Sequence, residues 1–334
     1  MDSENPSRGG LDQCDLEWSH VYRDSLGRDC RRNVARRDHL DGENFAGKSE
    51  LEFCFDNKTN VLAGRFYRTS DSRWIQRYKC VGCGLRFSRA TFDKCYRQKK
   101  RRKNAQLERL LTIGVSMREC ARTLNIHRTT VQRKKTFLAL QALFWLVQFR
   151  KQYETSSVQF DDMETFEHTK CKPVSITLAV EKYSRLILAV EAASMPAKGL
   201  LVKKAMKKYG PRRDDRKAAR RKLLSDLKVC TSENLLIESD QNPHYEPDVK
   251  EYFPNAAYVT FKGRRACVVG QGELKGGGFD PLFSLNHTCA MLRANMNRLF
   301  RRTWCTTKKI NGLHEHLAIY AKNHNLKILQ NKAS

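Results

Sequence analysis

The segment SVQFDDMETF (157–166), followed by PVSITLAVEKYSRLILAVEAA (173–193), decides the fold class of the second half of this chain. Both stretches are rich in Val, Ile, Leu and Thr, which favour β-strands, and the polar residues 182–184 interrupt the second stretch as a turn. The pattern predicts one strand followed by a β-hairpin. Further strands are expected at LLIESD (235–240) and AAYVTFKG (256–263).

Helical segments alternate with these strands. We expect a highly charged helix over residues 203–228, a long basic helix over 286–308 and another helix over 313–322. Strands and helices that alternate in this way are typical of a mixed α/β domain. The sequence therefore predicts an α/β domain with a mixed sheet over residues 155–326.

The charge of the chain points to its class of partner. Of 334 residues, 63 are Lys or Arg and 36 are Asp or Glu, which gives a formal net charge of +27. A charge of this size favours a polyanionic partner, and nucleic acid is the usual one. No apolar run approaches the ~20 residues of a membrane span, and the polar start MDSENPSRGG lacks the apolar core of a secretory signal. We expect a cytoplasmic protein of bacterial type, associated with the nucleoid and not with a membrane.

The first half of the chain divides into three parts by composition. Residues 1–50 are polar and without sustained periodicity, and we expect a poorly ordered arm. Residues 51–96 contain short aromatic and Cys-rich segments, which predict a small β-rich module. Residues 97–152 open with the basic run RQKKRRK, in which Arg101 and Arg102 are candidate DNA contacts, and then have a helical pattern.

A cysteine pair in the β-rich module has the spacing of half a structural zinc site. Cys80 and Cys83 are three residues apart, so their thiolates can converge on one tetrahedral ion. Cys54 lies upstream, but Asn57 stands where a second pair would be completed, and Asn is a poor zinc ligand. The weaker candidates for the missing ligand are Cys95 and His39. Two interpretations stay open, a zinc-ribbon-like module and a ribbon that keeps its shape without metal.

Residues 104–137 fit an all-α helix-turn-helix. Ser116, followed three residues later by Glu119, matches a capping box after the break at Gly114, and residues 125–127 form a tight turn. The side chains exposed at the start of the next helix suit base edges and phosphates in a major groove. These candidate DNA-binding residues are Arg128, Thr129, Gln132, Arg133, Lys134 and Lys135. The alternative is a plain helical hairpin with a solvated basic face.

Two acids occupy suggestive places in the second half. Asp161 follows the apolar strand 158–160, and Asp240 ends the strand 235–240. Carboxylates at the ends of neighbouring strands can bind a divalent cation between them, and oxygen ligands favour Mg²⁺ or Mn²⁺. Such ions support phosphodiester chemistry. Taken alone, the pattern is also that of strand-end caps and turns.

Three stretches of the second half resemble the DDE transposases of bacterial insertion sequences, close to the IS-one-like group. They are QFDDMETFEHTKCKP, ESDQNPHYEP and DPLFSLNHTCAMLRANMNRLFRRTWCTTKK. The segment FYRTSDSRWIQRYKCVGCGLRFSRATFDKCYRQKKRR is similar to the N-terminal zinc ribbon of that group. The resemblance covers roughly residues 54–326. It implies a retroviral-integrase-like (RNase H-like) domain that cuts element ends and joins the 3′-OH to target DNA.

The resemblance also implies a catalytic set. Asp161 and Asp240 take the first two acidic positions and hold Mg²⁺ or Mn²⁺. Asn286 stands where a third acid is expected, and its amide can ligate Mg²⁺ without supplying charge. Glu273 is the alternative third ligand, in a loop just before three glycines. The implied partners are double-stranded DNA, as element ends and target, and further copies of this chain assembled on DNA.

The expected function is therefore DNA transposition. The main alternative is a sequence-specific DNA-binding protein that has lost catalysis, which Asn57 and Asn286 favour. A cationic protein of membrane surfaces is less favoured, because we see no basic amphipathic helix with a clean lipid-facing side.

Overall fold

The computed structural model describes residues 60–69, 72–82, 84–91, 93–96, 98–262, 280–300 and 305–333. The chain divides into two compact units, Met1–Lys103 and Asn104–Ser334. Each unit is described by itself.

The first unit contains a three-stranded antiparallel sheet in the order β1-β2-β3. Its strands are β1 (Asn60–Arg68), β2 (Arg73–Cys80) and β3 (Arg86–Ser88), followed by the 3-10 helix η2 (Arg89–Thr91). The Tyr78 and Phe87 rings stack on neighbouring strands with their centroids 5.7 Å apart. The prediction of a small β-rich module is confirmed for these residues.

The second unit is built on a five-stranded mixed sheet in the order β6-β5-β4-β7-β8. The central strand β4 pairs antiparallel with β5 and parallel with β7, and β8 extends the parallel part. The strands are β4 (Thr155–Phe166), β5 (Pro173–Glu181), β6 (Ile187–Ser194), β7 (Thr231–Asp240) and β8 (Ala257–Phe261). The prediction of an α/β domain with a mixed sheet is confirmed.

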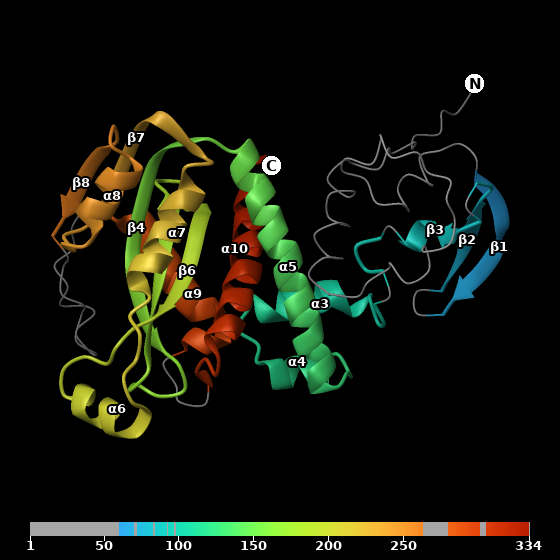
Figure 1. Ribbon diagram of the computed structural model, residues 1–334, viewed down its shortest axis with the longest axis horizontal. Coiled ribbons are helices and arrows are strands. Elements are labelled where there is room, and N and C mark those ends of the chain that lie inside the picture. Colours follow the sequence, from blue (N-terminus) through green and yellow to red (C-terminus); the bar gives the residue numbers. More distant parts are fainter. Residues whose placement is uncertain are drawn as a thin grey trace. The chain divides into compact units, whose positions relative to one another are not determined.

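The helices of this unit cover the sheet (Figure 1). Helix α7 packs against β5 and β6, α9 against β4 and β5, and α10 against β6 and the long helix α5. Leu223, Leu224 and Tyr245 join Phe160 in the main hydrophobic core. Their bounds are α5 (Arg128–Gln152), α7 (Arg216–Leu227), α8 (Tyr245–Tyr252), α9 (Phe283–Asn295) and α10 (Ile310–Ala333).

The predicted helix breaks before residue 152 are confirmed. Helix α3 (Lys103–Leu111) precedes a turn at Gly114, α4 (Met117–Thr123) precedes a turn at Asn125, and both turn residues have positive φ. Ser116 caps α4, because its hydroxyl accepts the Glu119 amide at 3.2 Å. Glu119 itself pairs with Arg122, so only half of the expected capping box is observed.

Helices α3 and α4 belong to the same compact unit as the mixed sheet, and α10 contacts α3 directly. His316 of α10 is fully buried and its Nε2 lies 2.8 Å from the Leu111 carbonyl oxygen. Glu108 of α3 accepts hydrogen bonds from Lys322 and Asn323 of α10, at 3.0 and 2.8 Å. Helix α3 is therefore fixed on the α/β domain by contacts with α10.

Two predicted helices differ from the observed ones. The charged segment 203–228 forms two helices, α6 (Leu201–Tyr209) and α7, because Gly210 with φ +72° and Pro211 end the first. The segment 286–308 does not form one helix, since α9 ends at Asn295 and the short helix η4 (Asn297–Leu299) follows. Among the described residues, no helix has the combination of length and apolar character needed to span a membrane.

Candidate active site

The register of the central strands brings the two predicted acids together. Gln159 of β4 and Glu238 of β7 are direct partners, and the Gln159 Nε2 donates to Glu238 Oε2 at 2.7 Å, so both side chains lie on one face of the sheet. Side chains alternate along a strand, so the residues two positions further share that face. Those residues are Asp161 and Asp240.

Asp161 lies within β4, and the prediction that it follows the strand is wrong in that respect. The β4–β5 ladder continues beyond it, with Asp161 opposite Leu178 and Phe166 opposite Pro173. Antiparallel pairing with β5 therefore holds Asp161 more firmly than a loop would. Asp240 is the last residue of β7, as predicted.

Tyr245 of α8 supports the Asp161 carboxylate. The Tyr245 hydroxyl donates to Asp161 Oδ1 at 3.0 Å, and the Asp162 amide donates to the same oxygen at 2.6 Å. The Tyr245 ring is fully buried and packs on Phe160, with the centroids 4.8 Å apart. This fixed hydroxyl holds the carboxylate in one orientation.

The two carboxylates lack compensating positive charge. Burial, and then the charge of Asp240, raise the pKa of Asp161 from 3.8 to about 7. Burial also raises the pKa of Asp240, and the Asp162 carboxylate adds to that rise. No ion pair between described residues includes Asp161 or Asp240. Partly buried carboxylates without an ion-pair partner suit a divalent cation.

Asp162 and Glu164 alternate with Asp161 across the strand, as predicted. The Thr177 hydroxyl on β5 donates to the Asp162 carboxylate, and Lys198 Nζ pairs with Glu164 at 2.5 Å. Both acids therefore already have partners of their own.

Asn286 lies on the exposed side of α9, and its amide nitrogen donates to Asp280 Oδ2 at 2.9 Å. One turn further along α9, Cys289 is close enough to Asp161 for that carboxylate to help burial raise the thiol pKa to about 12. The helix therefore passes beside Asp161. The structure gives Asn286 no contact with the acid pair, and Glu273 lies outside the described residues.

A donor set of three acidic, His or Cys side chains is not found at this place. In the described part of the chain, no group of three such residues is arranged to hold a metal ion. A site at Asp161 and Asp240 would thus rest on two carboxylates and on neutral oxygen ligands.

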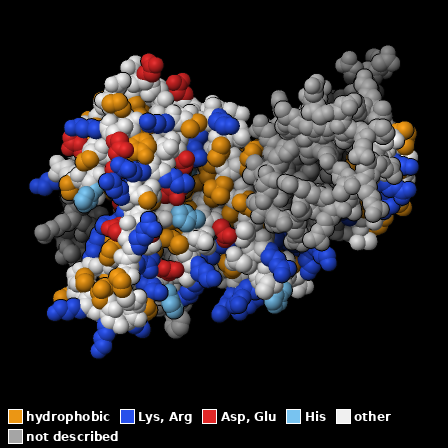
Figure 2. Space-filling model, viewed as in Figure 1, with side chains coloured by type: hydrophobic (Ala, Val, Ile, Leu, Met, Phe, Trp, Pro, Cys, Tyr) orange, Lys and Arg blue, Asp and Glu red, His pale blue; other side chains and the backbone are white. Residues whose placement is uncertain are grey.

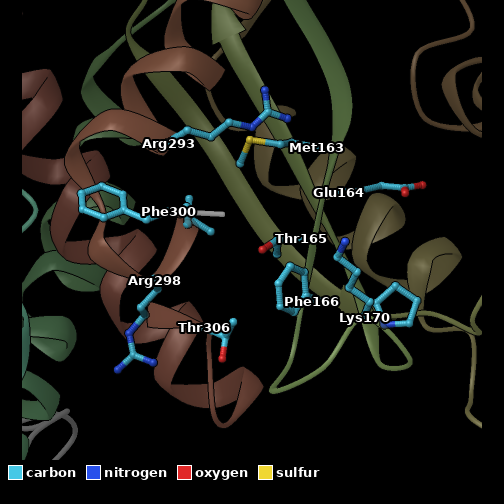
Figure 3. Close-up of a pocket in the computed structure, with 11 residues that line it drawn as sticks. Met163, Glu164, Thr165, Phe166, Lys170, Arg293, Arg298, Phe300 and Thr306 are labelled. Atoms are coloured by element: carbon cyan, nitrogen blue, oxygen red, sulfur yellow. The ribbon is translucent and has the colours of Figure 1, made fainter. Parts of the chain in front are cut away.

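A cavity of about 340 Å³ lies along β4 beyond Asp161 (Figure 3). Met163 lines it and stands two residues after Asp161 on the same face of β4, and Arg293 lines it one turn after Cys289. Figure 3 shows Arg293 beside Met163, with Lys170 across the cavity. The other lining residues are Glu164, Thr165, Phe166, Pro173, Arg298, Leu299, Phe300 and Thr306. Cationic and aromatic side chains thus line a space that begins two residues beyond Asp161 on β4.

The start of α5 exposes only part of the predicted DNA-binding set. Its exposed members are Arg128, Thr129, Gln132 and Arg133. The prediction that Lys135 is exposed is wrong, because its side chain is fully buried and pairs with Glu315. Lys134 is also buried, and its Nζ donates to Asn104 at 2.7 Å. Both lysines face the domain because α5 packs there on α3 and α10.

The remaining predicted positions lie in the first unit. Arg102 is exposed, and Arg101 pairs with Asp93. Cys80 is buried at the end of β2, where its carbonyl accepts the Gly84 amide and its amide donates to the Leu85 carbonyl, both at 2.9 Å. Cys54 and Cys83 lie outside the described residues, so zinc binding stays a prediction.

Sequence reasoning missed the residues that organise the acid pair. They are Tyr245, Gln159 and Glu238, together with Lys182, whose Nζ pairs with Glu238 at 2.6 Å. The sequence contained one indication for Tyr245, which stands at a helix start five residues after Asp240. Gln159 and Glu238 are buried polar residues that lie among apolar residues in their strands. The sequence pattern therefore indicates the hydrophobic core and does not distinguish them as site residues.

A scan against protein-family models and a search of the curated proteins both find no match to this chain. The function is therefore inferred from the site.

The raised pKa of Asp161 predicts a pH-dependent stability. The folded protein binds this proton more tightly than the unfolded chain, so the stabilisation is complete below pH 3.8 and is lost as the pH rises through about 7. In metal-free buffer, we expect the Tm of the Asp161→Asn variant to rise relative to the Tm of wild type between pH 5 and pH 8. Thermal unfolding in EDTA measures this difference. Parallel curves for the two proteins would show that Asp161 does not titrate in this way.

Proposed function

We propose that this protein is a DNA transposase, which binds the ends of an insertion sequence and catalyses metal-dependent strand cleavage and strand transfer. The observation that carries the proposal is the placement of Asp161 and Asp240 side by side on parallel strands, where both are partly buried and neither forms an ion pair with another described residue. The antiparallel β4–β5–β6 part followed by parallel β7 and β8 supports an RNase H-like fold of the retroviral-integrase type.

The acid pair fits a divalent cation by its chemistry. Asp161 and Asp240 would hold Mg²⁺ or Mn²⁺, and Tyr245 would keep the Asp161 carboxylate oriented. Asn286 remains the proposed third ligand. Its side-chain nitrogen donates to Asp280, and this bond does not use the side-chain carbonyl oxygen, which is the atom suited to a metal. A bound cation would stabilise charge on the attacking and leaving oxygens of a phosphodiester.

The chain's own side chains would position the DNA. Arg293 and Lys170 line the cavity that lies beyond Asp161 on β4, and they would contact phosphates of the strand that is cut. The exposed residues at the start of α5 would read the element end in the major groove. Because α10 fixes α3 on the α/β domain, recognition by α5 would place the DNA at a defined distance from the acids.

A second candidate function is DNA binding without catalysis. The observation that favours it is Asn286, which is neutral, exposed and already bonded to Asp280.

A strand-transfer assay distinguishes the two functions. Full-length protein is incubated with duplexes from the DNA that flanks its own coding sequence, in Mg²⁺, Mn²⁺ or EDTA. The proposal expects joined products with either metal and none in EDTA. Sequence-specific binding without any product in both metals would support the DNA-binding alternative.

The helix-turn-helix assignment makes its own prediction. Arg133→Ala should weaken binding to the element end by about 1–3 kcal/mol while changing binding to scrambled duplex much less, because a base contact discriminates sequences. Lys151→Ala, which removes an exposed cation at the far end of α5, is the matched control and should leave the preference unchanged. Fluorescence anisotropy with both duplexes measures the preference. Equal losses on both duplexes would reduce Arg133 to a phosphate contact.

A further inference from the structure

Helix α6 has a strongly divided surface. Lys203, Lys204, Lys207 and Lys208 are all exposed and fall within one arc of about 140° at 3.6 residues per turn. Val202, Met206 and Tyr209 lie on the opposite side and are exposed, whereas Ala205, beside them on the helix, is buried. Helix α6 contains no acidic residue, and no ion pair between described residues includes any of the four lysines. Their positive charge is therefore available to a partner.

The segment that carries α6 is attached to the strand that carries the acids. Lys198 pairs with Glu164 at 2.5 Å, and Glu164 follows Asp162 by two residues on β4. Beyond α6, Arg212 pairs with Glu167 at 3.0 Å, just after the end of β4. Lys172 Nζ lies 4.5 Å from the centre of the Tyr209 ring, at the end of α6. These contacts hold α6 at a set position along β4 from the acid pair.

Helix α6 projects from the other helices of its unit at the end of the extended β4–β6 strands (Figure 1). Figure 2 shows Lys and Arg side chains at the lower left, where Figure 1 draws α6, around a group of hydrophobic ones. The arrangement offers a basic surface at the end of the strand that carries Asp161, separate from the exposed start of α5.

We propose that α6 binds the phosphate backbone of a second DNA duplex, the target, and holds it at the acid pair; this assignment of the duplex rests on the proposed transposase function. The lysine arc offers charge but no set of side chains suited to base edges, so the binding would be insensitive to sequence. A target duplex requires contacts of this kind, whereas an element end requires the base contacts that α5 offers.

An anionic membrane surface is the competing partner, because α6 is a basic amphipathic helix. The expectation that the chain has no such helix is wrong. The observations favour DNA, since α6 has only nine residues and its exposed apolar surface is limited to Val202, Met206 and Tyr209 with the preceding Leu200. The strength of membrane binding by such a helix grows with the apolar area that enters the lipid, and this area is small in α6.

The test compares two full-length variants with wild type. One is K203Q/K204Q/K207Q/K208Q; the control, K151Q/K228Q/K327Q/K332Q, removes four exposed lysines elsewhere in the unit. Affinity for a random-sequence duplex is measured against salt concentration in EDTA. Each phosphate contact contributes about 0.9 to the log–log slope, so the α6 variant should lower the slope by about 2 or more and the control by less than about 1. A K203R/K204R/K207R/K208R variant should restore the wild-type slope.

The outcomes separate this proposal from the proposed function. An unchanged slope in a folded α6 variant, beside an active wild-type strand-transfer reaction, would overturn the role of α6 alone. A lowered slope beside an inert wild-type protein would support α6 as a DNA surface and reject the transposase. Loss of binding to phosphatidylserine vesicles with an unchanged DNA slope would assign α6 to a membrane and overturn the proposal. Comparable circular dichroism of all variants establishes that they are folded.

Discussion

Replacing Asp161 or Asp240 by Asn is expected to lower the rate of strand transfer by about a thousandfold or more, which corresponds to about 4 kcal/mol of activation free energy. The reason is that both carboxylates lie on the same face of the sheet, where they can bind one divalent cation, and an amide supplies no charge to that cation. Binding to the element end should stay within about twofold of wild type, because the exposed start of α5 is unaffected. Product formation in single-turnover reactions and anisotropy measure the two quantities.

Two variants serve as controls for this prediction. Asp162→Asn should be milder, since Thr177 already binds that carboxylate on the other side of the strand. Glu246→Gln changes an exposed acid of α8 and should have almost no effect. A rate within tenfold of wild type for Asp161→Asn would show that this carboxylate does not hold the catalytic ion.

Replacing Asp248 by Ala is expected to lower the free energy of unfolding by about 3–5 kcal/mol, because it leaves a buried guanidinium without its partner. Arg220 Nη2 lies 2.5 Å from Asp248 Oδ2, and both side chains are less than a tenth exposed. Arg220 also lies over the Tyr245 ring, 5.4 Å from its centre. Loss of this pair should therefore also loosen the tyrosine that binds Asp161. Urea unfolding measures the stability.

The control for this prediction is a nearby exposed pair. Glu251 pairs with Arg221 at 2.5 Å near the surface, so Glu251→Ala should cost less than about 1 kcal/mol. The double variant Arg220→Met/Asp248→Leu should recover most of the lost stability, because it removes both buried charges. A loss below about 1 kcal/mol in Asp248→Ala would mean that the pair is not buried in solution.

Local pattern was sufficient for much of the fold and for the position of Asp240 in it. The alternation of strands and helices predicted the mixed sheet. Gly114 and Asn125 marked the helix breaks, and both residues adopt the positive φ that Gly and Asn tolerate best. Asp240 could be assigned to a strand end because the apolar run stops there. The β-rich module before residue 97 followed from its short aromatic segments.

The errors arose where long-range packing decides the outcome. The basic residues around Lys135 in the sequence indicate a solvated helical turn. Lys135 is instead buried and forms an ion pair with Glu315, 180 positions away. Asp161 seemed to follow a strand because the apolar run ends at Phe160, whereas pairing with β5 extends the strand to Phe166. The Tyr245 hydrogen bond to Asp161 depends on how α8 packs, which no local pattern reports.

The measurement that tests the central claim most directly is the metal preference of an Asp161→Cys variant in strand transfer. Mg²⁺ strongly prefers oxygen ligands, whereas the transition-metal ion Mn²⁺ accepts a thiolate more readily. If the side chain at position 161 binds the catalytic ion, the ratio of Mn²⁺-supported to Mg²⁺-supported rate should rise at least about tenfold above the wild-type ratio. Residual activity with the wild-type ratio, or wild-type activity that persists in EDTA, would contradict a metal site at Asp161 and Asp240.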